Sequence, residues 1–161
     1  MPKFTIFNIG DETFGVDISR VLEILRVPKI FSVPGLPEFL SGVISVRGAV
    51  MPVMDLRLRF GMMPAGRKER IVLVRCGAEK IGFLVDEIKE ILLLNPEEIK
   101  PPPSLFRGCK TEYLTGLGKK GERIILLLNI DTVLTSEERI RLQESKELLE
   151  EKGAGTGKAA Q

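Results

Sequence analysis

The sequence contains no histidine and no tryptophan, and it has only one tyrosine and two cysteines in 161 residues. Without histidine, the chain lacks the commonest general base and the commonest metal ligand of proteins. It also lacks the glycine-rich phosphate loops and the Gly-x-Ser-x-Gly motif that mark nucleotide-binding proteins and hydrolases. We therefore expect a protein that is not an enzyme and that holds no metal ion or other cofactor.

Charge and hydropathy exclude two further classes. The net charge is only +2 and aromatic residues make up 6% of the chain, so no basic surface interleaved with aromatics predicts nucleic-acid binding. The most apolar run, Ile88 to Leu94, contains Lys89 and Glu90 and is far shorter than a membrane span, and the N-terminus does not resemble a signal peptide. We expect a cytoplasmic protein without direct membrane insertion. Cys76 and Cys109 form no Cys-x-x-Cys pair, and Cys76 ends an apolar strand, as a small core residue would.

The stretch from Gly42 to Leu56 is the most distinctive part of the chain. It predicts two short apolar strands joined by a turn at Arg47-Gly48 and closed by Asp55-Leu56. Arg47 is the only charged residue between Gly42 and Met54. The pattern leaves open whether Arg47 is an exposed turn cation without a role or a binding contact, for which a guanidinium is well suited.

Alternating apolar residues and turn signals predict further hairpins, formed by 4–9 with 14–18, by 71–74 with 81–85 and by 111–118 with 122–128. A short helical turn is expected over 55–61, with Gly61 as its stop. The segments 17–25 and 86–94 fit a helix or a strand equally well, so both assignments stay open.

Two parts of the chain repeat. Gly15 to Leu25 aligns without gaps with Gly82 to Leu92, and Glu23 then matches Glu90. Further along, 42–56 has a looser counterpart in 116–130. The repeat predicts an all-β fold with short helices, built from two similar units of about five short strands that each curl into a small barrel. The two barrels would lie side by side and leave a groove that suits a partner segment.

The C-terminal region differs from the repeats. Thr135-Ser136-Glu137-Glu138 has the signature of a capping box and predicts a helix over 135–152, whose sparse apolar residues indicate a solvated appendage. A disordered tail is expected over 153–161. The domain itself would then cover 1–134, with subdomains of roughly 1–66 and 67–134 between which strands may be exchanged.

Several motifs in this order resemble the CheW-like domain family, which includes the adaptor of bacterial chemotaxis arrays and the regulatory domain of the chemotaxis histidine kinase CheA. The resemblance extends from Phe4 to Leu134. Its motifs are Phe14-Gly15-Val16, Val21-x-Glu23-Ile24, Gly42-Val43-Ile44-Ser45-Val46-Arg47-Gly48, Pro52-Val53-x-Asp55-Leu56, Gly82-Phe83-Leu84-Val85-Asp86 and 111–118. Ser45-Val46 departs from the Asn-Leu common at that place in the family, whereas Arg47-Gly48 keeps the family pattern.

The resemblance implies two SH3-like five-stranded barrels and a non-catalytic scaffold for signal transduction by protein–protein interaction. Its partners would be the CheA regulatory domain and the cytoplasmic tip of methyl-accepting chemotaxis receptors. The receptor helix would dock in the inter-barrel groove, at the positions matching Val21, Glu23, Gly42, Arg47, Ile71 and Val72. The resemblance assigns no kinase-facing residues.

Two alternatives compete with this interpretation. One is a CheW-like coupling module of a non-chemotaxis signalling array. The other is a small β-barrel nucleic-acid-binding protein, against which the missing histidine, phosphate loop and aromatics all count.

Overall fold

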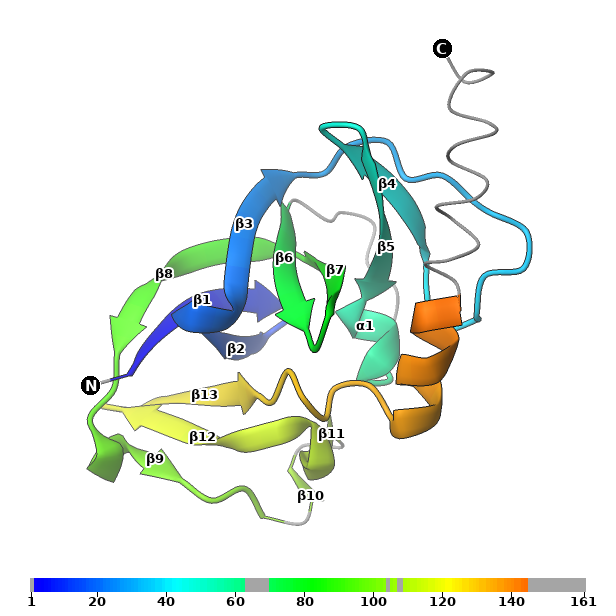
Figure 1. The fold of residues 1–161 in the computed structure, drawn as a ribbon. Coiled ribbons are helices and arrows are strands. Elements are labelled where there is room, and N and C mark those ends of the chain that lie inside the picture. The colour runs from blue at the N-terminus through cyan, green and yellow to red at the C-terminus, as the bar shows by residue number, and fades with distance from the viewer. Residues whose placement is uncertain (1, 63–69, 104, 107–108, 145–161) are drawn as a thin grey trace.

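Two curled β-sheets form the body of the protein (Figure 1). The structure is a computed structural model that describes residues 2–62, 70–103, 105–106 and 109–144. One sheet has six strands in the order β8-β1-β2-β13-β12-β9, and the other has five in the order β3-β6-β7-β5-β4. The six-stranded sheet consists of β1 (Lys3–Ile9), β2 (Glu12–Asp17), β8 (Glu87–Leu93), β9 (Ile99–Lys100), β12 (Leu114–Lys120) and β13 (Arg123–Leu128). The five-stranded sheet consists of β3 (Val21–Arg26), β4 (Gly42–Val46), β5 (Ala49–Asp55), β6 (Arg70–Cys76) and β7 (Glu79–Val85).

Short elements connect these strands. A third, two-stranded sheet pairs β10 (Leu105–Phe106) with β11 (Cys109–Lys110). The one-turn helix α1 (Leu56–Arg59) follows β5, with Asp55 accepting a hydrogen bond from the backbone N–H of Arg57. The 3-10 turns are η1 (Ile18–Arg20), η2 (Pro96–Glu98) and η3 (Thr111–Tyr113).

Both sheets share one topology, as the repeat in the sequence predicts. In each, two antiparallel hairpins are joined by a parallel pair, β2 with β13 in one sheet and β5 with β7 in the other. The chain changes sheet twice: β3 follows β2 but pairs with β6, and β8 follows β7 but pairs with β1. The two segments that fit either a helix or a strand are therefore mainly strands, because each completes the opposite sheet.

The two sheets are not built from two consecutive halves of the chain. A boundary near residues 66 and 67 does not separate the two sheets, since the six-stranded sheet takes its strands from both ends of the repeat region. Relative to that boundary, the hairpins β1–β2 and β6–β7 each lie in the sheet of the other half. The sequence allowed for exchanged strands but did not identify these hairpins.

Each sheet closes on itself through the segment that follows β3 in one sheet and β8 in the other. After β3, Phe31 forms a two-hydrogen-bond bridge with Val43 of β4, at the far edge of the same sheet. After β8, β9 pairs with β12 in the corresponding place. Closure protects the outer edges of β4 and β12 from pairing with other chains.

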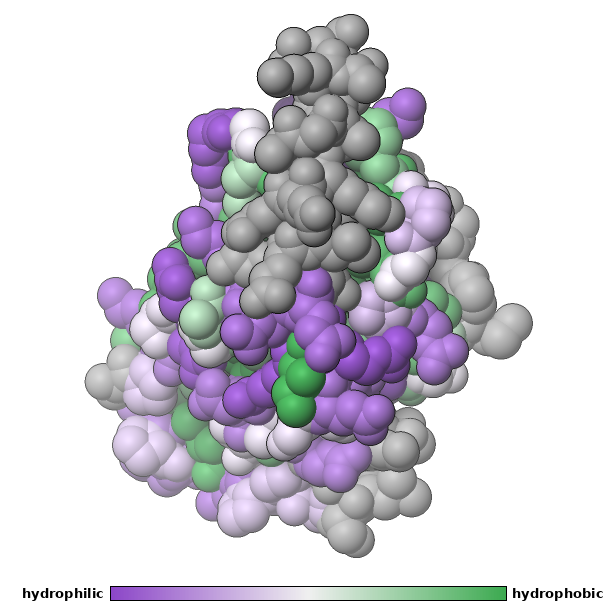
Figure 2. All heavy atoms as spheres, turned by 45° about the vertical axis from the view of Figure 1, so that its right-hand side comes forward, coloured by the Kyte–Doolittle hydropathy of each residue, from purple (hydrophilic) through white to green (hydrophobic). Residues whose placement is uncertain are grey.

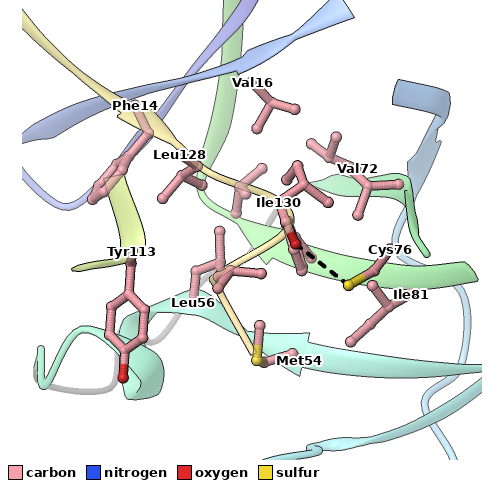
Figure 3. Packing of buried hydrophobic residues seen from close by; sticks show 14 of the residues in the cluster. Phe14, Val16, Met54, Leu56, Val72, Cys76, Ile81, Tyr113, Leu128 and Ile130 are labelled. Carbon is pink, nitrogen blue, oxygen red and sulfur yellow. Dashed lines mark hydrogen bonds between the residues drawn. The ribbon is translucent and has the colours of Figure 1, made fainter. Parts of the chain in front are cut away.

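Three apolar clusters fill the protein. One lies inside each barrel, and the largest joins the two sheets; it includes Phe14 and Leu128 from one sheet and Val72, Cys76 and Ile81 from the other (Figure 3). Neighbouring residues of β6 alternate between clusters, with Ile71 inside the barrel and Val72 in the inter-sheet layer. The unbroken apolar runs at 71–74 and 125–128 follow from this arrangement, because both faces of those strands are buried.

The C-terminal helix is packed against the domain, and the expectation of a solvated appendage is wrong. Its described part, 136–144, lies beside α1 (orange in Figure 1). Leu142 is 1% exposed within the inter-sheet cluster, and Glu138 forms an ion pair with Arg59 of α1 at 2.6 Å. The predicted capping box is present, since Thr135 and Glu138 exchange hydrogen bonds. The expected tail over 153–161 lies outside the described residues.

Candidate interaction surface

Arg47 stands at the turn between β4 and β5 in an unusual backbone conformation. Its φ of 48° is the only positive value among non-glycine residues of the described chain, and Gly48 follows with a φ of 82°. A two-residue hairpin turn with positive φ at both positions matches the twist of the strands, but Asn or Gly usually occupies its first position. A backbone conformation that disfavours arginine suggests that the side chain, rather than the turn, explains this residue.

The guanidinium of Arg47 is held by Glu23 of β3. Its Nη1 and Nη2 donate to the two carboxylate oxygens at 3.0 and 2.5 Å. These hydrogen bonds lower the pKa of Glu23 and raise that of Arg47. The Arg47 side chain nevertheless remains 70% exposed. A bidentate pair fixes the plane of the guanidinium and uses two of its five N–H donors, so the others can bind a partner.

Gly42 has a structural role. It is buried, and a Cβ on it would lie 2.6 Å from both the carbonyl oxygen and the neighbouring side chain of the segment that crosses it, Phe31 O and Ile30 Cγ2. A residue larger than glycine would separate that segment from β4. Gly42 therefore supports barrel closure and offers no side chain to a partner.

Ile71 and Val72 are both 0% exposed, which corrects their expected role as contacts lining the groove. Their side chains fill the barrel interior and the inter-sheet cluster, respectively. Of the apolar residues expected in the groove, only Val21 is partly accessible, since it packs at the margin of the inter-sheet cluster.

The sequence pattern did not single out the exposed apolar residues of β3 and β8. Leu22 and Ile24 on β3 are each 41% exposed, and Ile91 and Leu93 on β8 are 59% and 41% exposed. Ile24 and Ile91 occupy matching places in the repeat, which the alignment of 15–25 with 82–92 could have flagged. We call Val21, Leu22, Glu23, Ile24 and Arg47 the β3 surface.

A second ion pair accompanies the exposed residues of β8. Arg123 of β13 donates to Glu90 at 3.2 Å, and Glu90 is the counterpart of Glu23. The glutamate–arginine pairing is thus common to both barrels, but Arg123 begins a strand, whereas Arg47 occupies the turn itself.

Figure 2 shows the face of the molecule that carries helix 136–144. The described part of the face that carries helix 136–144 is mostly hydrophilic, with isolated hydrophobic side chains (Figure 2). Helix 136–144 also carries an exposed isoleucine, Ile140, whereas Ile24 and Ile91 are exposed at matching places of the repeat.

The described residues offer little for catalysis. Within them, no group of three or more His, Cys, Asp or Glu side chains is placed to hold a metal ion. Cys76 is buried, which raises the pKa of its thiol, and its Sγ donates to the carbonyl oxygen of Ile130 at 3.4 Å. Burial and a raised pKa make this thiol a poor nucleophile. No helix in the described ranges is long and apolar enough to span a membrane.

Comparison with known proteins agrees with this geometry. The family model described as the CheW-like domain matches residues 3–138. The chain belongs to the CheW-like domain family. Chemotaxis protein CheW of Klebsiella aerogenes is 36% identical over 84% of this chain and 83% of its own length. Chemotaxis protein CheW of Treponema pallidum is 26% identical over 87% of this chain and 86% of its own length.

A solved structure supports the same assignment. The scaffolding protein TtCheW from Thermoanaerobacter tengcongensis superposes with a TM-score of 0.78 at 30% identity, covering 86% of this chain and 91% of that one. The expected pair of SH3-like subdomains is confirmed. The matches over most of the chain give it the role of a chemotaxis adaptor, and the family to which it belongs is one of scaffold proteins.

Proposed function

We propose that this chain works without catalysis in the bacterial cytoplasm, coupling the cytoplasmic tip of chemotaxis receptors to the regulatory domain of the chemotaxis histidine kinase. The observation that carries the proposal is the β3 surface. There, Leu22 and Ile24 are exposed, and Glu23, which lies between them in the sequence, orients a guanidinium that is still 70% exposed.

This chemistry suits an amphipathic helix. The apolar face of a helix buries Leu22 and Ile24, while a carboxylate or amide on its flank accepts hydrogen bonds from Arg47. The receptor tip is a helical hairpin in this family, so it is the partner that we assign to the β3 surface. The exposed residues of β8 extend the same kind of surface to the second barrel, and the kinase domain binds elsewhere.

Titration calorimetry tests the proposal with the intact chain as one component. The second component is a receptor-tip helical hairpin fragment, a kinase regulatory domain or a generic oligonucleotide. We expect the first two to bind and the oligonucleotide not to bind at low salt. Failure of both proteins to bind, or strong salt-sensitive binding of the oligonucleotide, would refute the adaptor assignment.

Two matched variants locate the receptor site. Ile24→Asp places a charge on the β3 surface, and Ile140→Asp makes the same change on helix 136–144, where the isoleucine is 59% exposed. Both substitutions should leave the fold intact, because neither side chain is buried. Only Ile24→Asp should weaken binding of the receptor fragment. Equal effects of the two variants on binding would show that the receptor does not bind at the β3 surface.

A further inference from the structure

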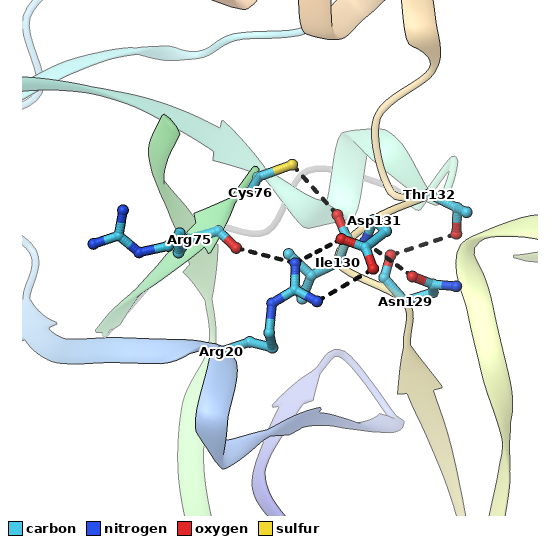
Figure 4. A network of polar contacts seen from close by, with 7 residues as sticks. All are labelled: Arg20, Arg75, Cys76, Asn129, Ile130, Asp131 and Thr132. Carbon is cyan, nitrogen blue, oxygen red and sulfur yellow. Dashed lines mark hydrogen bonds and ion pairs between the residues drawn. The ribbon is translucent and has the colours of Figure 1, made fainter. Parts of the chain in front are cut away.

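The segments in which the chain changes sheet are each fixed by an ion pair, and the charges of the two pairs are reversed. In the first, Arg20 of η1 contacts Asp131, which follows β13, at 2.7 and 3.3 Å (Figure 4). In the second, Asp86 contacts Arg57, which follows β5. Asp131 and Arg57 occupy matching places, two residues after Asn129 and Asp55, whose side chains accept their backbone N–H groups.

Each pair also reaches the hairpin of the sheet that the chain is entering. Arg20 Nη2 donates to the carbonyl oxygen of Arg75 at 3.3 Å, just before the β6–β7 turn. Asp86 donates its backbone N–H to the carbonyl oxygen of Asn8 at 3.0 Å, and its side chain accepts the N–H of Gly10, at the β1–β2 turn. Both crossing segments are thereby tied to the ends of both sheets.

The two pairs differ in burial. Asp86 and Arg57 are 21% and 12% exposed, whereas Asp131 and Arg20 are 61% and 31% exposed. An exposed pair is screened by solvent and contributes little to global stability. Arg20 immediately precedes Val21, the first residue of β3, so its main effect falls on the placement of the β3 surface rather than on the core.

We propose that Arg20 is a positioning residue for receptor binding, which it promotes by holding the start of β3 through Asp131 and the Arg75 carbonyl. This inference rests on the proposed function. Without the pair, the start of β3 populates other positions, and the receptor binds only the fraction in which the β3 surface is aligned. The pKa of Asp131 is lowered by Arg20, so the pair is charged at neutral pH.

A double-mutant cycle in receptor-fragment affinity tests the proposal with the full chain. We expect Arg20→Ala and Asp131→Ala each to weaken binding about threefold to fivefold, as the loss of one exposed ion pair allows. The double variant should lose no more than either single one. Arg75→Ala is the matched control, because it removes the exposed positive side chain of the residue next to the pair in space and keeps its carbonyl, which is the group that Arg20 contacts.

Hydrogen exchange separates positioning from general destabilisation. In both single variants, β3 amides should exchange faster, while those of β7 keep their wild-type protection. The inference is refuted if the single variants bind the fragment as tightly as the wild type does, or if their losses of binding free energy add in the double variant. It is also refuted if Arg75→Ala weakens binding as much as Arg20→Ala does. Failure of the wild-type chain to bind the fragment would instead refute the proposed function.

Discussion

Gly42 and Gly116 occupy equivalent points in the two barrels, each directly beneath a carbonyl oxygen of the segment that closes its sheet. A Cβ would lie 2.6 Å from Phe31 O at the first position and 2.8 Å from Lys100 O at the second. Real Cβ atoms do not approach backbone this closely, so glycine at both places is a condition for barrel closure.

Alanine at either glycine should therefore destabilise the fold. We expect Gly42→Ala and Gly116→Ala each to lower the free energy of unfolding by about 2 kcal/mol, because the closing segment must move away from its strand. Urea unfolding followed by circular dichroism gives this number. If Gly42→Ala kept wild-type stability but lost the receptor fragment, Gly42 would be a contact residue after all.

The buried ion pair should outweigh the exposed one in stability. Asp86→Asn removes the negative charge from a pair whose side chains are only 12% and 21% exposed, and we expect a loss of about 2 kcal/mol. Asp131→Asn should cost less than about 1 kcal/mol, since that carboxylate is 61% exposed. Unfolding curves of the two variants in one buffer make the comparison. Equal losses would contradict the division of roles between the two pairs.

Acid should release the C-terminal helix before the barrels unfold. Burial raises the pKa of Glu138, but hydrogen bonds from Arg59 and Thr135 outweigh it and hold the pKa below the ordinary 4.5. Because the pKa is depressed, the ion pair contributes its full stabilisation at pH values above 4.5. This stabilisation is lost as the pH falls through the lower pKa of the folded state.

Tyr113 reports this release. It is the only tyrosine of a chain without tryptophan, and the Arg59 guanidinium lies 5.5 Å from its ring centroid and donates to its hydroxyl at 3.3 Å. Tyrosine fluorescence should change at acidic pH while β-sheet circular dichroism persists. In Glu138→Gln the acid transition should disappear. A fluorescence transition that Glu138→Gln leaves unchanged would show that another group controls the helix.

Sequence patterns predicted the parts of the fold that depend on neighbouring residues. Turn residues located the hairpins, and the capping box located the start of the last helix. The repeat predicted two similar barrels, because glycine spacing survives where the backbone needs it, as at Gly42 and Gly116. The crossings from one sheet to the other before β3 and β8 were not predictable, since each strand has the same local pattern in either sheet.

The candidate site was predicted less completely. Arg47 and Glu23 were named separately, and their contact depends on the packing of the β4–β5 turn against β3. Ile71 and Val72 appeared available because an apolar run does not show which of its faces are covered, and both faces of β6 are. The exposure of Ile24 and Ile91 depends on which sheet each strand joins, and the local sequence does not predict that sheet.

We propose that the guanidinium of Arg47, and not the backbone turn, is what places an arginine at this position. Arg47→Asn separates the two roles, because asparagine suits a positive φ and replaces the guanidinium with a short amide. We expect a thermal midpoint equal to or above that of the wild type, together with lost binding of the receptor fragment in titration calorimetry. Wild-type affinity in Arg47→Asn would contradict it.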